Sequence, residues 1–592
     1  MEINRNTFHW QLPVVLQAIA DAHFVTIDLE LSGIHSKTSH RLKTVPTPGS
    51  KQTLQQRYEE IKEAAEKYTI LQIGLTCVSE DFSTGSYIAR PFNFHLNPVP
   101  QERLDFERIF SYQSGAVEFL LSHGFRMEAP FKEGVPYLSR LEETVVREIE
   151  SSRQNLGDIE IEAQDTESTD FLQRVRTEIK AWIEMKNPKA DFLNIAPASH
   201  ATVGAQSAER GLNAYQKRLV HQLVRAEFPK FVTAGKHGFI QIVAYNKKRE
   251  DAVRALKTKS LEEKVARQTG MRWLVEALVG GDLSGIDPLT FTKKMDEDAT
   301  SVTVDLDKAE RDFAKLCAKL KSKKTILVGH NVFVDLVNFY HCFFGDLPDK
   351  VDDFQSIINL LFPLVIDTKY LATYNNSASN AKSGLDDLDH ELSKDPVPVI
   401  ETHRDHARYY DSQKALHHEA GYDSFLTAKV MIRLSARLEA SSHYVGHSAR
   451  KDGPRIPQVT QGRRPDQGGS WLNGMWNAAS SAVGYPNNTT TVEGSTSPSF
   501  LIDDTDDFEL PKRTGKRKVE EKDMLSFAHS GMFDALSGTQ PKGPSKQMTT
   551  LLGTPVVMMP HWASEFWKIY GNKLRINGTI EGVCDLAIYG SD

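Results

Sequence analysis

Acidic residues that stand beside apolar runs, spread over nearly four hundred positions, place the strongest constraint on this fold. Asp28 and Glu30 follow the apolar run that begins FVTI, and Asp335 follows ILVGHNVFV. Asp423 precedes the run that begins SFLTAKV, and His418 stands five residues before it. A carboxylate buried against such a run is unfavourable unless it gains a partner, a metal ion or a raised pKa. The chain is therefore expected to bring these distant segments together around one site.

The elements around the first acidic pair predict an α/β layer. Residues 13–22 have the apolar spacing of a short helix, and residues 24–27 read as a strand that delivers Asp28 and Glu30. Positions i and i+2 of a strand share one face, so both carboxylates can point the same way. Two more strand-like runs follow at residues 69–79 and 85–94. Alternation of this kind predicts an α/β fold with a mixed sheet.

The same pattern resumes after residue 320. Residues 325–329 predict a strand, residues 331–344 a helix that carries Asp335 in its first turns, and residues 422–437 a helix with Asp423 at its start. Between the two α/β stretches, residues 171–249 read as a separate small α+β unit of two helices and a strand. We interpret this order as one nuclease-like sheet interrupted by an inserted domain.

Charge is unevenly distributed along the chain. The whole sequence has a formal net charge of -7, yet residues 171–270 contain 19 Lys and Arg against 9 Asp and Glu. A protein that simply coats nucleic acid is therefore not indicated, whereas a localised phosphate-binding surface is. The four cysteines are far apart and form no paired motif, which argues against a disulfide framework and a zinc finger.

The last third of the chain changes character. Residues 441–550 are rich in Gly, Ser, Thr, Pro and Asn and are predicted to be a disordered linker. The basic run at residues 512–518 is either a nuclear localisation patch or a solvated charge run. Residues 551–592 regain aromatic and strand character, with two short strands expected around a turn. No signal peptide or membrane-spanning stretch is visible, so a soluble, intracellular protein is expected.

Oxygen ligands suit hard divalent cations, so four converging carboxylates would make a site for Mg²⁺. A histidine beside them suggests that a proton is taken from water, and the set predicts two-metal hydrolysis of a phosphodiester. Each motif alone more often marks a surface or structural group. The conjunction is stronger, because order, spacing and context fit one architecture.

The order Asp-x-Glu, Asp, His-x4-Asp resembles that of the DEDD exonucleases with a catalytic histidine. More narrowly, FVTIDLELSGI, GHNVFVDL and HEAGYDSF resemble the poly(A)-specific ribonuclease family over about residues 1–440. The resemblance implies a ribonuclease H-like fold in which Asp28, Glu30 and Asp423 hold two Mg²⁺ ions, with Mn²⁺ as a substitute. It also implies that Asp335 completes the second metal site and that His418 is the general base.

Two further residues lie near these motifs or follow a similar apolar run. His417 is a spare candidate for the base, although the spacing to Asp423 in the family motif favours His418. Asp367, in VIDTKY, follows a buried-looking strand and is interpreted as a supporting or structural residue.

The resemblance further implies that the inserted domain binds single-stranded nucleic acid and is named for an Arg and a His one helical turn apart. Lys217 stands where the Arg is expected, four residues before His221, with Arg218 beside it. The implied organisation is a nuclease domain at residues 1–165 and 251–440, the inserted domain at 166–250 and the linker at 441–550. Residues 551–592 would form a C-terminal segment, for which a partial RNA-recognition fold is one interpretation. Trp562 and Trp567 are expected to be core residues of this segment.

The function implied is that of a Mg²⁺-dependent 3′-to-5′ exoribonuclease that shortens poly(A) tails and releases 5′-AMP. Its substrate would be single-stranded RNA with a free 3′ hydroxyl. The protein would be a homodimer that acts in mRNA decay, in the nucleus and the cytoplasm. One alternative keeps the chemistry and trims the 3′ ends of small non-coding RNAs. The other is a catalytically inactive RNA-binding protein, against which the presence of all five expected site residues argues.

Overall fold

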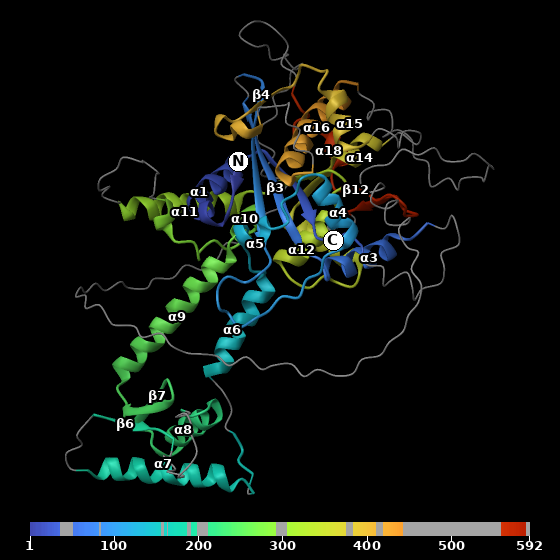
Figure 1. The fold of residues 1–592 in the computed structure, drawn as a ribbon. Helices are drawn as coiled ribbons and strands as arrows, with labels where there is room; N and C mark the ends of the chain where they lie inside the picture. Colours follow the sequence, from blue (N-terminus) through green and yellow to red (C-terminus); the bar gives the residue numbers. More distant parts are fainter. Residues whose placement is uncertain are drawn as a thin grey trace, which may run out of the picture. The chain divides into compact units, whose positions relative to one another are not determined.

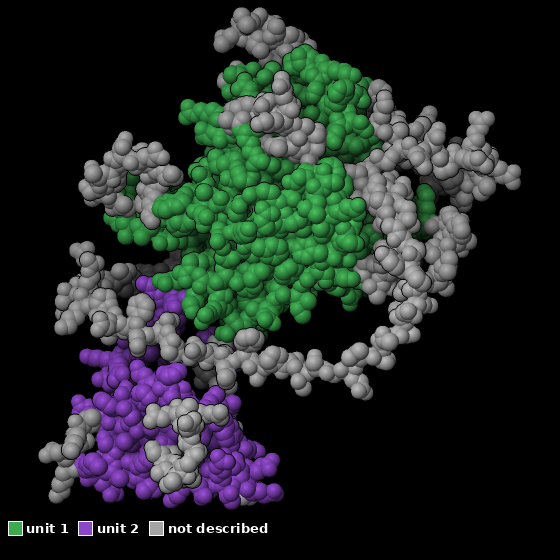
Figure 2. All heavy atoms as spheres, in the orientation of Figure 1, with its two compact units in different colours: residues 1–148, 262–484, 532–592 green, residues 149–261, 485–531 purple. Residues whose placement is uncertain are grey.

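The computed structural model describes residues 1–35, 51–81, 84–154, 159–162, 164–185, 191–197, 211–291, 305–374, 383–409, 418–441 and 558–587. His417, the basic run at 512–518 and nearly all of the predicted linker lie outside these residues. The chain divides into two compact units (Figure 2). The first contains the described parts of Met1–Glu148, Glu262–Gly484 and Met532–Asp592, and the second contains those of Ile149–Leu261.

The first unit is built on a mixed sheet, as the sequence predicts. The path of neighbouring strands runs β1-β4-β3-β2-β9-β10, and β5 and β11 pair with β4. Strands β2, β3 and β4 are antiparallel neighbours, whereas β9 lies parallel to both β2 and β10. The strands span Glu2–Ile3 (β1), Phe24–Leu31 (β2), Ile70–Asp81 (β3), Ser86–Asn97 (β4), Val135–Pro136 (β5), Ile326–Gly329 (β9), Leu364–Asp367 (β10) and Val399–Thr402 (β11).

Helices cover both faces of this sheet, with α1 on one side and α15 and α16 on the other (Figure 1). Asn4 caps α1 with its side chain, so that helix begins at Arg5, well before the predicted residue 13. The helices of this unit span Arg5–Asp21 (α1), Leu54–Ala65 (α3), Ser114–Ser122 (α4), Ala129–Glu133 (α5), Arg272–Val279 (α10), Leu306–Ser322 (α11), Phe333–Phe343 (α12), Val351–Leu361 (α13), Thr368–Thr373 (α14), Leu385–Leu392 (α15), Ala420–Ser441 (α16) and Glu565–Tyr570 (α18). Short 3-10 turns occupy Pro288–Phe291 and Arg404–Tyr409.

Alternation along β2 separates two hydrophobic cores. Val25, Ile27 and Leu29 belong to the core that contains α1, α10 and α12, whereas Phe24 belongs to the core that contains α16. Successive side chains of a strand point to opposite faces, so the even-numbered positions of β2 lie on the side covered by α16.

The C-terminal residues 558–587 join these cores. Strands β12 (Lys573–Arg575) and β13 (Val583–Asp585) form a two-stranded antiparallel hairpin, as expected from the sequence. Leu574 and Cys584 are buried in the first core, and Trp567 is buried in the second, with its ring stacked on Trp562. The described part of this segment is therefore an integral layer of the first unit, and the two tryptophans lie in or against its core.

The second unit has its own core. Its antiparallel sheet has the order β6-β8-β7, where the sequence predicted a single strand. The elements span Thr166–Glu184 (α7), Phe192–Ile195 (β6), Ala214–Glu227 (α8), Phe231–Lys236 (β7) and Phe239–Ala244 (β8). Helices α6 (Arg140–Gln154) and α9 (Lys247–Thr269) each continue across the boundary between the units along the chain. Among the described residues, no helix has the length and apolar character needed to cross a bilayer.

Candidate active site

Strand β2 carries the first two acidic residues of the site. Thr26, at an even position, donates its hydroxyl to the carbonyl of Ser424 in α16 at 2.6 Å. Asp28 and Glu30 continue the same alternation, and both line the cavity beside α16. Asp28 is half-buried and Glu30 is 5% exposed, so neither carboxylate is fully hydrated.

A close approach between α16 and strand β3 positions His418 and Asp423. Gly74 pairs with Asp28 across the sheet, and a Cβ at Gly74 would lie 1.8 Å from the carbonyl oxygen of Ala420. Two buried side chains of the sheet accept hydrogen bonds from the first turn of α16. Gln72 accepts from the Ala420 amide at 2.9 Å, and Asn93 accepts from the Gly421 amide at 3.0 Å. The helix therefore begins directly over the sheet, with Asp423 in its first turn.

A tight turn from β9 into α12 delivers Asp335. A Cβ at Gly329 would lie 2.3 Å from the Val332 side chain, so the turn requires glycine there. Asn331 has a φ of 59°, in the left-handed region that non-glycine residues seldom adopt. Asp335 lies in the first turn of α12, where the helix dipole favours a negative charge.

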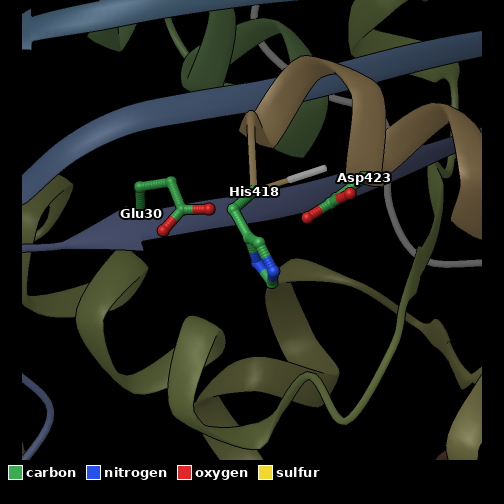
Figure 3. Close-up of side chains that lie close together, drawn as sticks. All are labelled: Glu30, His418 and Asp423. Carbon is green, nitrogen blue, oxygen red and sulfur yellow. The ribbon is translucent and has the colours of Figure 1, made fainter. Parts of the chain in front are cut away.

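All five residues predicted from the sequence line one cavity of about 230 Å³. Glu30, His418 and Asp423 each offer a ligand atom, and these atoms all lie within 4.8 Å of one another. Figure 3 shows the three side chains close together, with His418 drawn between Glu30 and Asp423 and its ring below the two carboxylates. Asp28 and Asp335 also line the cavity, so residues separated by almost four hundred positions converge.

Burial raises the pKa of every predicted carboxyl, and the charges of neighbouring carboxylates raise it further. For Asp28 the larger cause is burial and the smaller is the charge of Asp335. Glu30 is affected by burial and then by Asp28 and Asp423. Burial raises the pKa of Asp335 to about 8, and burial followed by Asp28 raises that of Asp423. Without cations, these groups cannot all be ionised near neutral pH.

The predicted base has a constrained backbone and aromatic neighbours. His418 has a φ of 65°, a second left-handed non-glycine residue on the cavity wall. Its ring centroid lies 4.8 Å from that of Phe119 and 4.1 Å from that of His123, both edge-on. Left-handed backbone at two non-glycine positions of one cavity is typical of functional sites.

Sequence reasoning missed several residues of this cavity. Asp386 and Asp387 reach it from the first turn of α15, and the charge of Asp386 contributes to the raised pKa of Asp423. Acidic residues in a first helical turn are common, so their pattern carried no distinctive information. His330 and Asn331 also line the cavity, and the GHN motif that contains them was visible in the sequence. Burial lowers the pKa of His330 to about 3, so this ring is neutral.

The donor set fits hard divalent cations. It consists of carboxylate oxygens, the ligands that Mg²⁺ and Mn²⁺ prefer, in a partly buried cavity where two cations would relieve the repulsion. Asp28, Glu30, Asp335 and Asp423 are the residues that would hold such ions.

The predicted RNA-binding residues lie in the second unit, on helix α8. Lys217, Arg218 and His221 are half-buried there. Lys217 donates to the carbonyl of Lys236 at 2.9 Å, and His221 Nδ1 lies 2.5 Å from the Thr233 hydroxyl. Burial, followed by the charge of Lys217, lowers the pKa of His221. Lys217 and His221 therefore sit against the sheet of this unit, and the role of all three residues in RNA binding stays a prediction.

Comparison with known proteins identifies a family. A model described as CAF1 family ribonuclease matches residues 3–431. The poly(A)-specific ribonuclease PARN of Xenopus laevis is 26% identical over 446 residues, which cover 74% of this chain and 62% of that protein. The pre-piRNA 3′-exonuclease trimmer of Bombyx mori is 24% identical over 462 residues, covering 75% of this chain and 74% of that protein. The chain thus spans about three fifths of the PARN relatives' length. A solved structure of Schizosaccharomyces pombe Pop2p, in a Mg²⁺- and Mn²⁺-bound form, aligns with a TM-score of 0.30 at 12% identity, covering 76% of this chain and 95% of that one.

Proposed function

The chain belongs to the CAF1 ribonuclease family, and from this premise we propose that it is a Mg²⁺-dependent exoribonuclease that removes nucleotides from the 3′ end of RNA. The observation that carries the proposal is the convergence of Glu30, His418 and Asp423 within 4.8 Å, in a cavity that Asp28 and Asp335 also line. A binding protein without catalysis would not need this costly grouping of four carboxylates and an imidazole.

In the proposed mechanism the protein residues hold and orient the metal ions and deprotonate the attacking water. Two divalent ions, when bound, would supply a lowered pKa for the attacking water and stabilisation of charge at the leaving 3′ oxygen. Asp28, Glu30, Asp335 and Asp423 would hold these ions. His418 accepts the proton of the water, because histidine imidazoles can take up and release protons near neutral pH.

The apolar part of the cavity suits a terminal base. Leu31, Ile34 and Phe119 line it beside the carboxylates. Aromatic and apolar side chains hold unpaired bases by stacking, which favours single-stranded RNA. We propose poly(A) as the substrate because the PARN relatives are named for it, and 5′-AMP as the product.

Trimming of small-RNA 3′ ends is the second candidate, favoured by the similarity to the Bombyx mori trimmer. A time course on a 5′-labelled RNA that ends in twenty adenosines, with Mg²⁺ or with EDTA, separates the two. A Mg²⁺-dependent ladder that stops at the first other base supports the deadenylase, and a ladder that continues through the body supports trimming. Absence of shortening while the RNA stays bound would contradict both.

The Asp28→Ala variant tests the site assignment. Removing this carboxylate should abolish hydrolysis, because a metal ligand is lost, while RNA affinity measured by gel shift stays close to that of the parent protein. The exposed Asp312 of α11 offers a matched control, since Asp312→Ala removes the same group outside the cavity. Full activity in Asp28→Ala would refute the assignment.

A further inference from the structure

Asp367 connects three separate segments of the chain through one carboxylate. This side chain is fully buried at the end of β10. Its Oδ1 accepts hydrogen bonds from the amides of Asn331 at 2.7 Å and Lys369 at 2.9 Å. Its Oδ2 accepts from the amide of Arg575, in strand β12, at 2.8 Å. One buried carboxylate thus links the β9–α12 turn, helix α14 and the C-terminal hairpin.

Contacts other than the one with Asp367 also hold the C-terminal hairpin against the fold. The Asn572 amide donates to Val365 of β10 at 2.7 Å, and the Asn572 side chain accepts from the Val365 amide at 2.8 Å. At the other end, Glu581 accepts from the amide of Leu54, the first residue of α3, at 2.9 Å. Gln355 of α13 donates to the Asp585 carbonyl at 2.9 Å. Helices and sheet therefore hold the hairpin independently of Asp367.

The turn that Asp367 holds leads directly to the candidate site. Asn331 lies in the left-handed region, which Asn tolerates better than most residues, and the hydrogen bond from its amide to Asp367 holds it there. Four residues later the same segment presents Asp335 to the cavity that Asn331 also lines. Thr368, next to Asp367, adds a second tie, because its hydroxyl lies 2.9 Å from His330 Nδ1.

We propose that the C-terminal strand β12 and Asp367 together are a positioning device for the metal site. The Arg575 amide orients the Asp367 carboxylate, and that carboxylate fixes the Asn331 turn and thereby Asp335. This inference rests on the proposed function, since it assigns Asp335 to a divalent cation. It gives residues distant from the nuclease motifs in sequence a role in metal affinity.

Two full-length variants break the link at different atoms. Asp367→Asn replaces a carboxylate oxygen by an amide that cannot accept all three backbone hydrogen bonds. Arg575→Pro deletes the amide that donates to Asp367 and leaves Asp367 itself in place. Arg575→Ala keeps that amide and removes only the guanidinium, which donates to the Thr373 hydroxyl and carbonyl at 2.8 and 3.0 Å. Ile580→Ala, at a 64% exposed position of the hairpin turn, is the surface control.

Mn²⁺ binding measured by electron paramagnetic resonance gives a readout separate from turnover. We expect Asp367→Asn and Arg575→Pro to bind Mn²⁺ about 10–100-fold more weakly, as is typical when a group that orients a metal ligand is lost. Their kcat should fall at limiting Mg²⁺ and recover at high Mg²⁺, with KM for RNA unchanged. Arg575→Ala should lower only the melting temperature. Ile580→Ala should change neither the melting temperature nor the affinity for Mn²⁺.

The outcomes separate this inference from the proposed function. Lower melting temperatures in Asp367→Asn, Arg575→Pro and Arg575→Ala, with Mn²⁺ affinity as in the parent protein, would show that these contacts only stabilise the fold and would overturn the proposal. A parent protein that binds Mn²⁺ but hydrolyses no RNA would contradict the proposed function and leave the Mn²⁺ comparison intact.

Discussion

At the scale of single residues, the candidate site combines conformations and charges that are unfavourable elsewhere. His418 and Asn331 adopt left-handed backbone, and six carboxyl groups line one cavity. Each feature works against folding, and strained or mutually repelling groups persist where the surrounding structure enforces them. The site is therefore expected to respond sharply to changes in proton and cation concentration.

His418→Asn tests the proposed base. Asn tolerates the left-handed region, so this variant removes the imidazole without adding backbone strain. We expect kcat to fall by about 10²–10⁴-fold, the usual contribution of general base catalysis, with RNA affinity unchanged. His390→Asn, on the exposed side of α15, is the matched control. Single-turnover rates that are equal in both variants would contradict the role of His418.

Asp335→Asn tests the electrostatic cost of the metal-free site. Its pKa rises from 3.8 to about 8 on folding, so Asp335 favours the folded state at low pH and this contribution is lost as the pH rises towards 8. In EDTA at pH 8 or above, the variant should melt at a higher temperature than the parent protein, by about 2–4 °C for each kcal/mol that the buried charge costs. At pH 4 the two should be similar.

Thermal scans between pH 4 and 9 check this expectation. Mg²⁺ should stabilise the parent protein more at pH 8 than at pH 5, because cations and protons compete for the same carboxylates. Equal pH profiles for the parent protein and the variant would refute the assignment of an unfavourable charge to Asp335.

At the scale of elements, the active site depends on how closely α16 approaches the sheet. Gly74 has no Cβ, and the start of α16 occupies that space, with Gln72 and Asn93 accepting its free amides. The first amides of a helix have no acceptor within the helix, so a buried helix start needs acceptors from elsewhere. Gln72 and Asn93 supply two of them. This contact between α16 and the sheet positions His418 and Asp423.

Gly74→Ala should therefore disturb both stability and catalysis. The new methyl group would overlap the Ala420 carbonyl, and overpacking of this kind costs about 1–3 kcal/mol. Gly115 of α4 has no atom within reach of a new Cβ, so Gly115→Ala should stabilise the protein by about 0.5–1 kcal/mol. Urea unfolding and kcat of both variants give the comparison. A Gly74→Ala protein that matches the parent in both quantities would show that α16 can move without consequence.

At the scale of the whole molecule, two compact units divide the proposed tasks. The first holds the carboxylates, and the second has its own sheet, its own core and the basic helix α8. Because each unit has a separate core, a surface change in the second should not alter chemistry in the first.

The double variant Lys217→Ala/Arg218→Ala tests this division. We expect weaker RNA binding and a salt dependence that is shallower by about 0.7 in log–log slope for each lost phosphate contact. The maximal rate at saturating RNA should stay unchanged. Lys180→Ala, on the exposed face of α7, removes one charge from the same unit as a control. An unchanged salt slope in the double variant would place the RNA elsewhere.

The sequence by itself indicated the mixed α/β sheet, because strand alternation and helical spacing are local patterns, and it indicated the five candidate residues through the combination of their motifs and the family resemblance. It also indicated the C-terminal hairpin, from the turn residues between two short apolar runs. It did not indicate Asp386 and Asp387, whose pattern is that of any helix start, nor the link from Arg575 to Asp367. Only the tertiary structure decided these points, because hydrogen bonds and cavities between residues hundreds of positions apart leave no periodicity in the chain. The close fit of α16 over Gly74 is of the same kind, since a single glycine in a strand acquires its meaning from the helix that packs against it.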